Sequence, residues 1–232
     1  MRDRIVVATT KSWDKYNFLQ LKHRLGKQYD FVLVPDKRNL NFAYLQNLAP
    51  KYIFFPHWSW IIPDYVYNNC ECIVFHMTDL PFGRGGSPLQ NLILKGLKNT
   101  MISAIRVVKG LDAGPVYLKR SLSLHGSAEE IYNRASKKIF DKMIPYLLYH
   151  KPKAAPQKGK VVVFKRRIPE QSRIPRNISL TDLYDYIRML DADGYPHAFI
   201  ENSRFRIEFK NAELKRNRLE ARITIFRKDK NG

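Results

Sequence analysis

The chain has 232 residues, of which 44% are hydrophobic and 27% charged, and its formal net charge is +20. These values are typical of a globular protein and exclude a disordered chain, and the length suits one α/β domain with a smaller appendage. No run approaches about 20 apolar residues, so no transmembrane helix is expected, and the N-terminus lacks the apolar core of a signal peptide.

Short apolar runs alternate with helical patterns over the first 150 residues. Strands are predicted at 5–8, 31–34, 52–55, 72–75, 101–107 and 116–118, and helices at 15–25, around 45–48, at 88–94 and from 128 through 143. Ser87 and Pro88 suit the start of the third helix, and Ser127 with Glu130 forms a capping box for the fourth. This alternation favours parallel pairing with right-handed crossovers. It predicts an α/β fold with a Rossmann-like, doubly wound, mainly parallel sheet.

The character of the sequence changes near residue 150. Residues 151–159, rich in lysine, proline and alanine, are typical of a linker. Beyond them we expect a strand at 161–164, a helix from Ser179 to Leu190 and two alternating strands around 205–209 and 223–225. The predicted organisation is a main domain over 1–150, followed by a linker and a small α+β C-terminal region over 151–232.

The positive charge is spread along the chain, with 20 basic and 10 acidic residues from Lys151 onward and 21 and 11 before it. Such spreading is typical of a solvated surface that prefers anionic ligands, for example a phosphorylated substrate or tRNA. The two cysteines, Cys70 and Cys72, are too few for a zinc site. We therefore expect no metal, and the cysteines fit a reducing cytoplasm.

Two loops carry the residues that indicate chemistry. The first follows the apolar run at 72–75, which ends on His76 and continues through Leu80-Pro81 and a glycine-rich loop into a helix. The second, at 108–116, places Asp112 in a glycine-bounded turn between two apolar runs. Polar residues at the carboxyl ends of parallel strands are where α/β proteins bind their ligands.

These residues resemble the core of the folate-dependent formyltransferases, which reads roughly Asn-x-His-x-Ser-Leu-Leu-Pro, then a glycine-containing loop, then Leu-Asp-x-Gly-Pro. Leu111-Asp112-Ala113-Gly114-Pro115 fits the last part, and the separation of 36 residues between His76 and Asp112 is the one that family uses. One family residue is replaced, because Val74 stands where asparagine is expected. The resemblance implies the formyltransferase fold, with the catalytic domain over 1–150.

Formyl transfer is the attack of an amine on a formamide-like carbonyl, so the site must remove a proton, stabilise an oxyanion and exclude water. By the resemblance, His76 and Asp112 are the catalytic groups, since a carboxylate can stabilise an imidazolium beside it. Val74 cannot donate a hydrogen bond to the oxyanion. Protonated His76, a backbone amide of residues 84–87 or the side chain of Gln90 could replace that donor, and we favour His76 acting with Gln90.

The resemblance implies 10-formyltetrahydrofolate as the formyl donor. Its pocket is expected at the segment after the third strand and at the opposite wall, which together comprise Trp60, Ile61, Ile62, Leu80, Val108, Gly110 and Leu111. No Gly-x-Gly-x-x-Gly follows the first strand, so a dinucleotide redox cofactor is not expected.

The family includes enzymes that act on glycinamide ribonucleotide, on methionyl-tRNA and on nucleotide-linked amino sugars. The chain is shorter than a tRNA formyltransferase with a full C-terminal barrel, and segments 164–170 and 187–199 resemble the sugar branch. We therefore predict an N-formyltransferase for the amine of a nucleotide-diphosphate amino-dideoxy sugar, in bacterial surface-glycan biosynthesis of the nonulosonic or pseudaminic acid type. Its candidate binding residues are Thr9, Thr10, Lys11, Arg84, Gly85, Gly86, Ser87, Arg166, Arg167, Tyr195 and Phe199.

Three alternatives stay open at this point. One is a methionyl-tRNA formyltransferase-like enzyme, and another is a relative that binds folate or a nucleotide sugar without catalysis, because of Val74. A third, an RNA-binding protein, rests on the charge alone and has no recognition motif. The expected partners are folate and a nucleotide sugar, with no membrane and with nucleic acid disfavoured. The protein is expected in the cytoplasm, and a homodimer is compatible with the sequence.

Overall fold

The computed structural model describes residues 2–228, and the chain divides into two compact units. The first unit runs to Gly85 and includes Thr100–Leu122 and Tyr132–Val163. The second comprises Gly86–Asn99, Ser123–Ile131 and the chain from Phe164 onward. Each unit is thus assembled from separate stretches of chain, whereas the sequence suggested a single boundary near residue 150.

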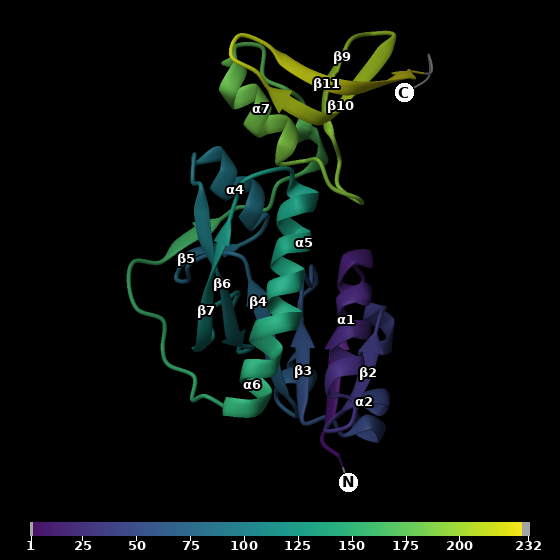
Figure 1. The fold of residues 1–232 in the computed structure, drawn as a ribbon, viewed down its shortest axis with the longest axis vertical. Helices are drawn as coiled ribbons and strands as arrows, with labels where there is room; N and C mark the ends of the chain where they lie inside the picture. Colours follow the sequence, from purple (N-terminus) through teal and green to yellow (C-terminus); the bar gives the residue numbers. More distant parts are fainter. Residues whose placement is uncertain (1, 229–232) are drawn as a thin grey trace. The chain divides into compact units, whose positions relative to one another are not determined.

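A six-stranded sheet with the order β2-β1-β3-β4-β6-β7 forms the centre of the first unit (Figure 1). Its strands are β1 (Arg4–Ala8), β2 (Asp30–Val34), β3 (Tyr52–Phe55), β4 (Glu71–His76), β6 (Asn99–Arg106) and β7 (Val116–Ser123). The first four are parallel, and Phe55 of β3 is paired with Val74 of β4. β4 and β6 are antiparallel, with His76 opposite Ser103. The predicted α/β fold with a mainly parallel sheet is confirmed.

The strands of this sheet are apolar because both faces are covered, as is usual for parallel sheets. Successive side chains of β1 point to opposite faces, and residues 5–8 are all fully buried. Val6 packs in a cluster with Leu45 of α2 (Phe42–Leu48) and Val66 of α3 (Asp64–Tyr67). In α1 (Ser12–Leu25), the ring of Phe18 meets that of Phe31 edge to face.

A long helix follows the last strand of the sheet. Its first part, α5 (Ala128–Lys138), continues through a π-helical turn, η2 (Ile139–Met143), into α6 (Ile144–His150). The predicted capping box is present: Ser127 N donates to Glu130 Oε2, and Glu130 N donates to Ser127 Oγ. Asn17 of α1 donates to Ser136 Oγ at 2.8 Å, and Figure 1 shows the two helices side by side.

The second unit combines helices with a three-stranded antiparallel sheet of order β11-β10-β9. Its elements are α4 (Pro88–Leu94), η3 (Pro169–Ser172), α7 (Leu180–Arg188), β9 (Ala198–Glu201), β10 (Phe205–Leu214) and β11 (Leu219–Arg227). Ser179 caps α7 by accepting a hydrogen bond from Asp182 N. The buried Arg188 pairs with Asp185 at 2.6 Å and donates to the carbonyl of Leu124.

Several short elements were not predicted from the sequence. β5 (Phe82–Gly85) pairs with β8 (Val162–Phe164) where only a glycine-rich loop was expected, and η1 (Lys37–Asn39) and α3 are too short to show a period. Strand β9 was also missed. Among the helices of residues 2–228, none has the length and apolar character needed to cross a membrane.

Candidate active site

His76 is the last residue of β4, and its side chain is only 8% exposed. Its Nε2 lies 2.7 Å from the carbonyl oxygen of Gly83, which also accepts from Thr78 Oγ1. A carbonyl oxygen can only accept, so Nε2 carries a proton. Nδ1 is therefore the ring atom that can gain or release the second proton.

Asp112 faces that atom from the loop between β6 and β7. Its Oδ2 lies 3.5 Å from His76 Nδ1 and accepts the backbone N–H of Gly85 at 2.9 Å. The backbone of Asp112 has a φ of +48°, a left-handed conformation in which aspartate is among the better tolerated residues. The two residues that the sequence predicted as a catalytic pair are thus brought together.

Gln157 holds the Asp112 loop in place, and sequence reasoning missed it. Its Nε2 donates to the carbonyls of Asp112 and Gly114, each at 2.8 Å. Its Oε1 accepts two hydrogen bonds from the guanidinium of Arg84, at 3.1 and 2.8 Å. A single glutamine within the predicted linker gives no sequence signal for this role. At Gly114 a Cβ would lie 1.7 Å from the carbonyl oxygen of Arg106, so the loop requires glycine there.

This arrangement can accept a proton and hold it. The lone pair of Nδ1 on neutral His76 can take a proton from an amine, and the carboxylate of Asp112 stabilises the imidazolium that results. An imidazolium at this position could also stabilise an oxyanion. Val74, between Phe55 and Ile105 in the sheet, offers no side-chain hydrogen bond.

The residues predicted to hold folate differ sharply in exposure. Trp60 and Ile61 after β3 are 40% and 79% exposed, and Leu111 is 58% exposed. Leu80 is fully buried, and Ile62 is partly buried against the core cluster that contains Val6 and Phe55. Gly110 has a left-handed φ of +108°. Exposed apolar side chains on one unit suit a flat heterocycle. The folate assignments, including Val108, stay predictions.

The substrate residues predicted in the first unit mostly have partners within it. Thr9 is fully buried and donates to Asp14, and the ammonium of Lys11 lies 5.4 Å from the ring centroid of Trp13. As described above, Arg84 donates to Gln157, and the backbone N–H of Gly85 donates to Asp112. Thr10 is partly exposed.

In the second unit, Ser87 stands at the N-cap of α4, but its hydroxyl accepts from the backbone N–H of Arg167 instead of capping the helix. At Gly86, an added Cβ would lie 2.5 Å from Cβ of Arg166, which shows a close approach of two chain segments. The Arg167 guanidinium donates to the carbonyl oxygen of Gln171. These contacts give this part of the loop a structural role.

Three further predicted residues of the second unit are also engaged. The ring of Phe199 is 3% exposed, and its centroid lies 3.7 Å from the guanidinium carbon of Arg206 and 5.5 Å from that of Arg173. Its predicted role in stacking a base stays a prediction. Tyr195 lies in a turn and is partly exposed. Gln90 is 2% exposed, and its Nε2 donates to the carbonyl oxygen of Met189 at 3.0 Å.

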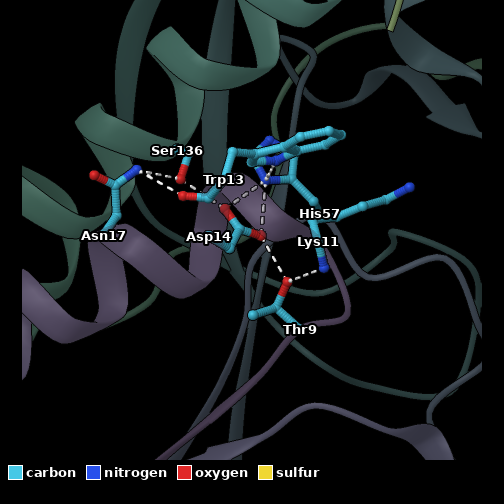
Figure 2. A network of polar contacts seen from close by, with 7 residues as sticks. All are labelled: Thr9, Lys11, Trp13, Asp14, Asn17, His57 and Ser136. Carbon is cyan, nitrogen blue, oxygen red and sulfur yellow. Dashed lines mark hydrogen bonds and ion pairs between the residues drawn. The ribbon is translucent and has the colours of Figure 1, made fainter. Parts of the chain in front are cut away.

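A second carboxylate–histidine pair, missed by sequence reasoning, lies in the first unit (Figure 2). Asp14 is fully buried and accepts from Thr9 Oγ1 and Ser136 Oγ, each at 2.6 Å, and lies 3.0 Å from Nδ1 of His57. Burial by itself raises the pKa of Asp14. The charge of His57 and the hydrogen bonds from His57, Ser136 and Thr9 outweigh it and hold the pKa below its ordinary value of 3.8.

Metal ligands were also sought in this structure. Across residues 2–228, no three His, Cys, Asp or Glu side chains lie in an arrangement that could hold a metal ion. A cavity of about 550 Å³ opens at the amino ends of β3 and β4, between Tyr52, Glu71, Arg106 and Tyr117. It contains none of the predicted site residues.

Comparison with known proteins identifies the class. Residues 169–226 match the family model of the methionyl-tRNA formyltransferase C-terminal domain. A solved structure of a methionyl-tRNA formyltransferase from Clostridium thermocellum is 50% identical, with a TM-score of 0.96, and the match covers 97% of this chain and 100% of that one. The chain therefore belongs to the folate-dependent formyltransferase family, whose formyl donor is 10-formyltetrahydrofolate.

Two proteins with lower sequence identity also match this chain. The methionyl-tRNA formyltransferase of Mycoplasma mycoides is 30% identical over 194 residues, which are 80% of this chain and 57% of that protein. The chain thus spans little more than half the length of the curated relatives it matches. HypX from Aquifex aeolicus, solved with tetrahydrofolic acid, shares the fold at 16% identity and a TM-score of 0.73, over 91% of this chain and 38% of that one.

These findings correct the predicted substrate. A sugar N-formyltransferase from a Shewanella species shares the fold but only 14% of its sequence, with a TM-score of 0.67 over 86% of this chain and 93% of that one. The nucleotide-sugar acceptor, the role in carbohydrate biosynthesis and the exclusion of nucleic acid were therefore wrong. The argument from length failed because the Clostridium relative is fully covered by this chain. The argument from the tail failed because the tail matches the tRNA formyltransferase model.

Proposed function

We propose that this protein transfers a formyl group from 10-formyltetrahydrofolate to the amine of methionyl-tRNA. The observation that carries the proposal is the His76–Asp112 pair, with Nδ1 facing the carboxylate at 3.5 Å, in a chain 50% identical to a methionyl-tRNA formyltransferase. The net charge of +20 supports a polyanionic acceptor, because lysine and arginine side chains release counterions from phosphates.

Each residue of the pair has a defined task in this proposal. The acceptor amine forms a bond to the formyl carbon, the bond from that carbon to the folate nitrogen breaks, and tetrahydrofolate leaves with the proton that its nitrogen regains. The pterin of the donor would lie against the exposed side chains of Trp60 and Ile61. His76 takes the proton that the attacking amine loses, on Nδ1, while its Nε2–H stays bonded to Gly83 O. Asp112 stabilises the charged ring and is itself held by Gly85 N–H. Together these groups act as a general base with its counter-ion.

Protonated His76 is also our proposed donor to the oxyanion, in the place of the asparagine that Val74 replaces. Gln90 donates one of its two amide N–H groups to Met189 O, so the predicted oxyanion role would have to use the other N–H. Turnover by Gln90→Ala tests this. A loss of more than tenfold with unchanged stability supports an oxyanion role, and a loss of less than threefold removes Gln90 from the site.

The activity is tested by incubating the full chain with 10-formyltetrahydrofolate and methionyl-tRNA and measuring formylmethionine released from the tRNA by mass. We expect turnover in the wild type and a loss of about 10²–10⁴-fold in His76→Asn, the usual contribution of a general base. His23→Gln, an exposed position on α1, is the matched control. Binding of tetrahydrofolate without any formylation of methionyl-tRNA would contradict the proposal and favour a non-catalytic relative.

A further inference from the structure

The Asp14–His57 pair has one polar atom with nothing to bind. His57 Nε2 is buried and has no hydrogen-bond partner among the described residues. Asp14 accepts from two hydroxyl groups and lies 3.0 and 3.1 Å from Nδ1 of His57. A buried polar atom without a partner is costly, so such an atom calls for an explanation.

The surrounding contacts fix which ring nitrogen carries the proton. The low pKa of Asp14 keeps it ionised, and a carboxylate only accepts hydrogen bonds. His57 Nδ1 must therefore carry a proton directed at Asp14. The indole N–H of Trp13, 3.3 Å from the same Nδ1, then cannot donate to it. In the neutral ring Nε2 is consequently a lone pair, held in one orientation by Asp14 and ready to accept a hydrogen bond.

The backbone at His57 gives an independent reason to expect function. His57 has a φ of +47°, in the left-handed region, which is uncommon for residues other than glycine although asparagine, aspartate and histidine adopt it more often than most. Residues kept in such conformations cluster at ligand-binding and active sites. His57 also lies just before the exposed segment with Trp60 and Ile61.

The position of the pair along the sheet relates it to His76. Phe55, the last residue of β3, is paired in parallel with Val74 of β4; His57 lies two residues beyond Phe55 in the turn after β3, and His76 lies two residues beyond Val74. His57 thus follows β3 and His76 ends β4, and both lie at the carboxyl ends of these neighbouring strands, where ligands of α/β proteins bind. Asp14 reaches the same edge from the first turn of α1, after β1.

The chemistry of the surroundings selects the ligand group. A carboxylate behind an imidazole lone pair creates a negative potential, which favours a hydrogen-bond donor and most of all a cationic one. Trp13 stacks on Tyr132 with the ring planes 4° apart, and His57 meets both rings edge to face. The Lys11 ammonium, 5.4 Å from the Trp13 ring centroid, shows that this ring accepts a cation.

We propose that His57 Nε2 binds the amine of the formyl acceptor and, supported by Asp14, positions that amine for transfer. The assignment of the acceptor rests on the proposed function, but the dyad and its vacant acceptor atom do not. His57 is here a binding and positioning residue, distinct from the general base His76. Because Nε2 is buried, a small movement of the side chains around it must accompany binding.

The first test is direct and needs no turnover. The chain has six histidines, so ¹⁵N-histidine labelling gives few signals, and loss of a signal in His57→Asn assigns His57. We expect a protonated Nδ1 and an unprotonated Nε2 in the free protein. Methionyl-tRNA should shift the Nε2 signal, whereas N-acetyl-methionyl-tRNA and uncharged tRNA, which lack the free amine, should not. A shift with uncharged tRNA would instead identify a ribose hydroxyl as the donor and overturn the amine assignment.

The second test separates positioning from folding. His57→Asn keeps an amide N–H near Asp14 and tolerates the left-handed backbone, but has no acceptor at the Nε2 position. We expect unchanged thermal stability and donor KM, with an acceptor KM raised about tenfold for one lost hydrogen bond to a charged group. His57→Gln, whose amide oxygen can reach the Nε2 position, should restore part of that affinity. His23→Gln is the exposed control.

These tests distinguish a failure of the amine site at His57 from a failure of the proposed function. If the wild type does not formylate methionyl-tRNA but methionine amide still shifts the Nε2 signal, the proposed acceptor is wrong and the amine site stands. If the wild type is active and neither amine probe moves Nε2, or if His57→Asn loses stability with no change in acceptor KM, the pair is structural and our inference is overturned. A Nε2 signal that is protonated from the start would also contradict it.

Discussion

The first unit contains two carboxylate–histidine pairs that look alike in composition and differ in the atoms left available. In the His76–Asp112 pair, Nε2 is bonded to a carbonyl and Nδ1 faces the carboxylate at 3.5 Å. In the His57–Asp14 pair, Nδ1 faces the carboxylate at 3.0 Å and Nε2 has no partner within residues 2–228. The nitrogen that can take part in chemistry or binding is therefore Nδ1 in the first pair and Nε2 in the second.

The difference teaches that the role of a histidine depends on what occupies its other nitrogen. A carbonyl on Nε2 fixes a proton there and leaves Nδ1 facing Asp112, which suits proton transfer. An ionised Asp14 fixes the proton on Nδ1 and leaves a lone pair on Nε2, which suits binding of a donor. Asp14 has three side-chain donors and is fully buried, whereas the Asp112 side chain is 12% exposed. We expect the first pair to control rate and the second to control binding and stability.

The largest expected effect is on rate. Asp112→Asn keeps the shape of the side chain but removes the charge that stabilises the imidazolium of His76, so kcat should fall by about 10²–10⁴-fold. Thermal stability should change little, because the amide oxygen can still accept from Gly85 N–H. Steady-state kinetics and a melting curve on the same preparation check this. A variant within tenfold of wild-type kcat would remove Asp112 from the catalytic machinery.

Asp14→Ala should mainly lower stability, in contrast to Asp112→Asn, which should mainly lower kcat. It leaves the hydroxyl groups of Thr9 and Ser136 and the Nδ1–H of His57 buried without their acceptor, which costs about 3–5 kcal/mol of unfolding free energy. Urea denaturation gives this value, with Asp64→Ala, at an exposed helix start, as the control. A cost below about 1 kcal/mol would show that the two pairs are energetically alike.

Gln157→Ala should disturb the His76–Asp112 pair and leave the His57–Asp14 pair unchanged. The side chain links the carbonyls of Asp112 and Gly114 to Arg84, so its loss should let Asp112 move relative to His76. We expect kcat to fall about tenfold, since misplacement of a catalytic group by 1 Å can cost up to 10²-fold. The acceptor KM should stay the same. A change in KM alone would instead place Gln157 in substrate binding.

The smallest effect concerns acid stability. The folded pKa of Asp14 lies below its ordinary value of 3.8, so its stabilisation is present above that value and is lost as the pH falls through the lowered folded pKa. Ser136→Ala removes one donor and should raise the folded pKa. Unfolding free energy at neutral pH should drop by about 1 kcal/mol, and acid unfolding should begin at higher pH. An unchanged acid transition would show that Ser136 does not stabilise the carboxylate.

The sequence by itself determined the sheet and one of the two pairs. Apolar runs at residues 5–8, 31–34, 52–55 and 72–75 are long enough and separated enough to predict parallel strands, and local capping by Ser127 and Ser179 was readable because it involves neighbours in sequence. His76 and Asp112 could be found because each belongs to a motif with a characteristic spacing. The acceptor was misjudged from chain length and from the tail, two features that do not report on substrate chemistry.

Only the tertiary structure decided what each of these side chains does. Asp14 and His57 are 43 residues apart, and Ser136 lies 122 residues from Asp14, so no local pattern links them. Gln157 likewise reaches Asp112 across 45 residues, and two arginines that the sequence does not place near Phe199 lie against its ring. Local periodicity specifies helices and strands because it arises from neighbours along the chain. Protonation and hydrogen bonding depend on groups that meet only after folding.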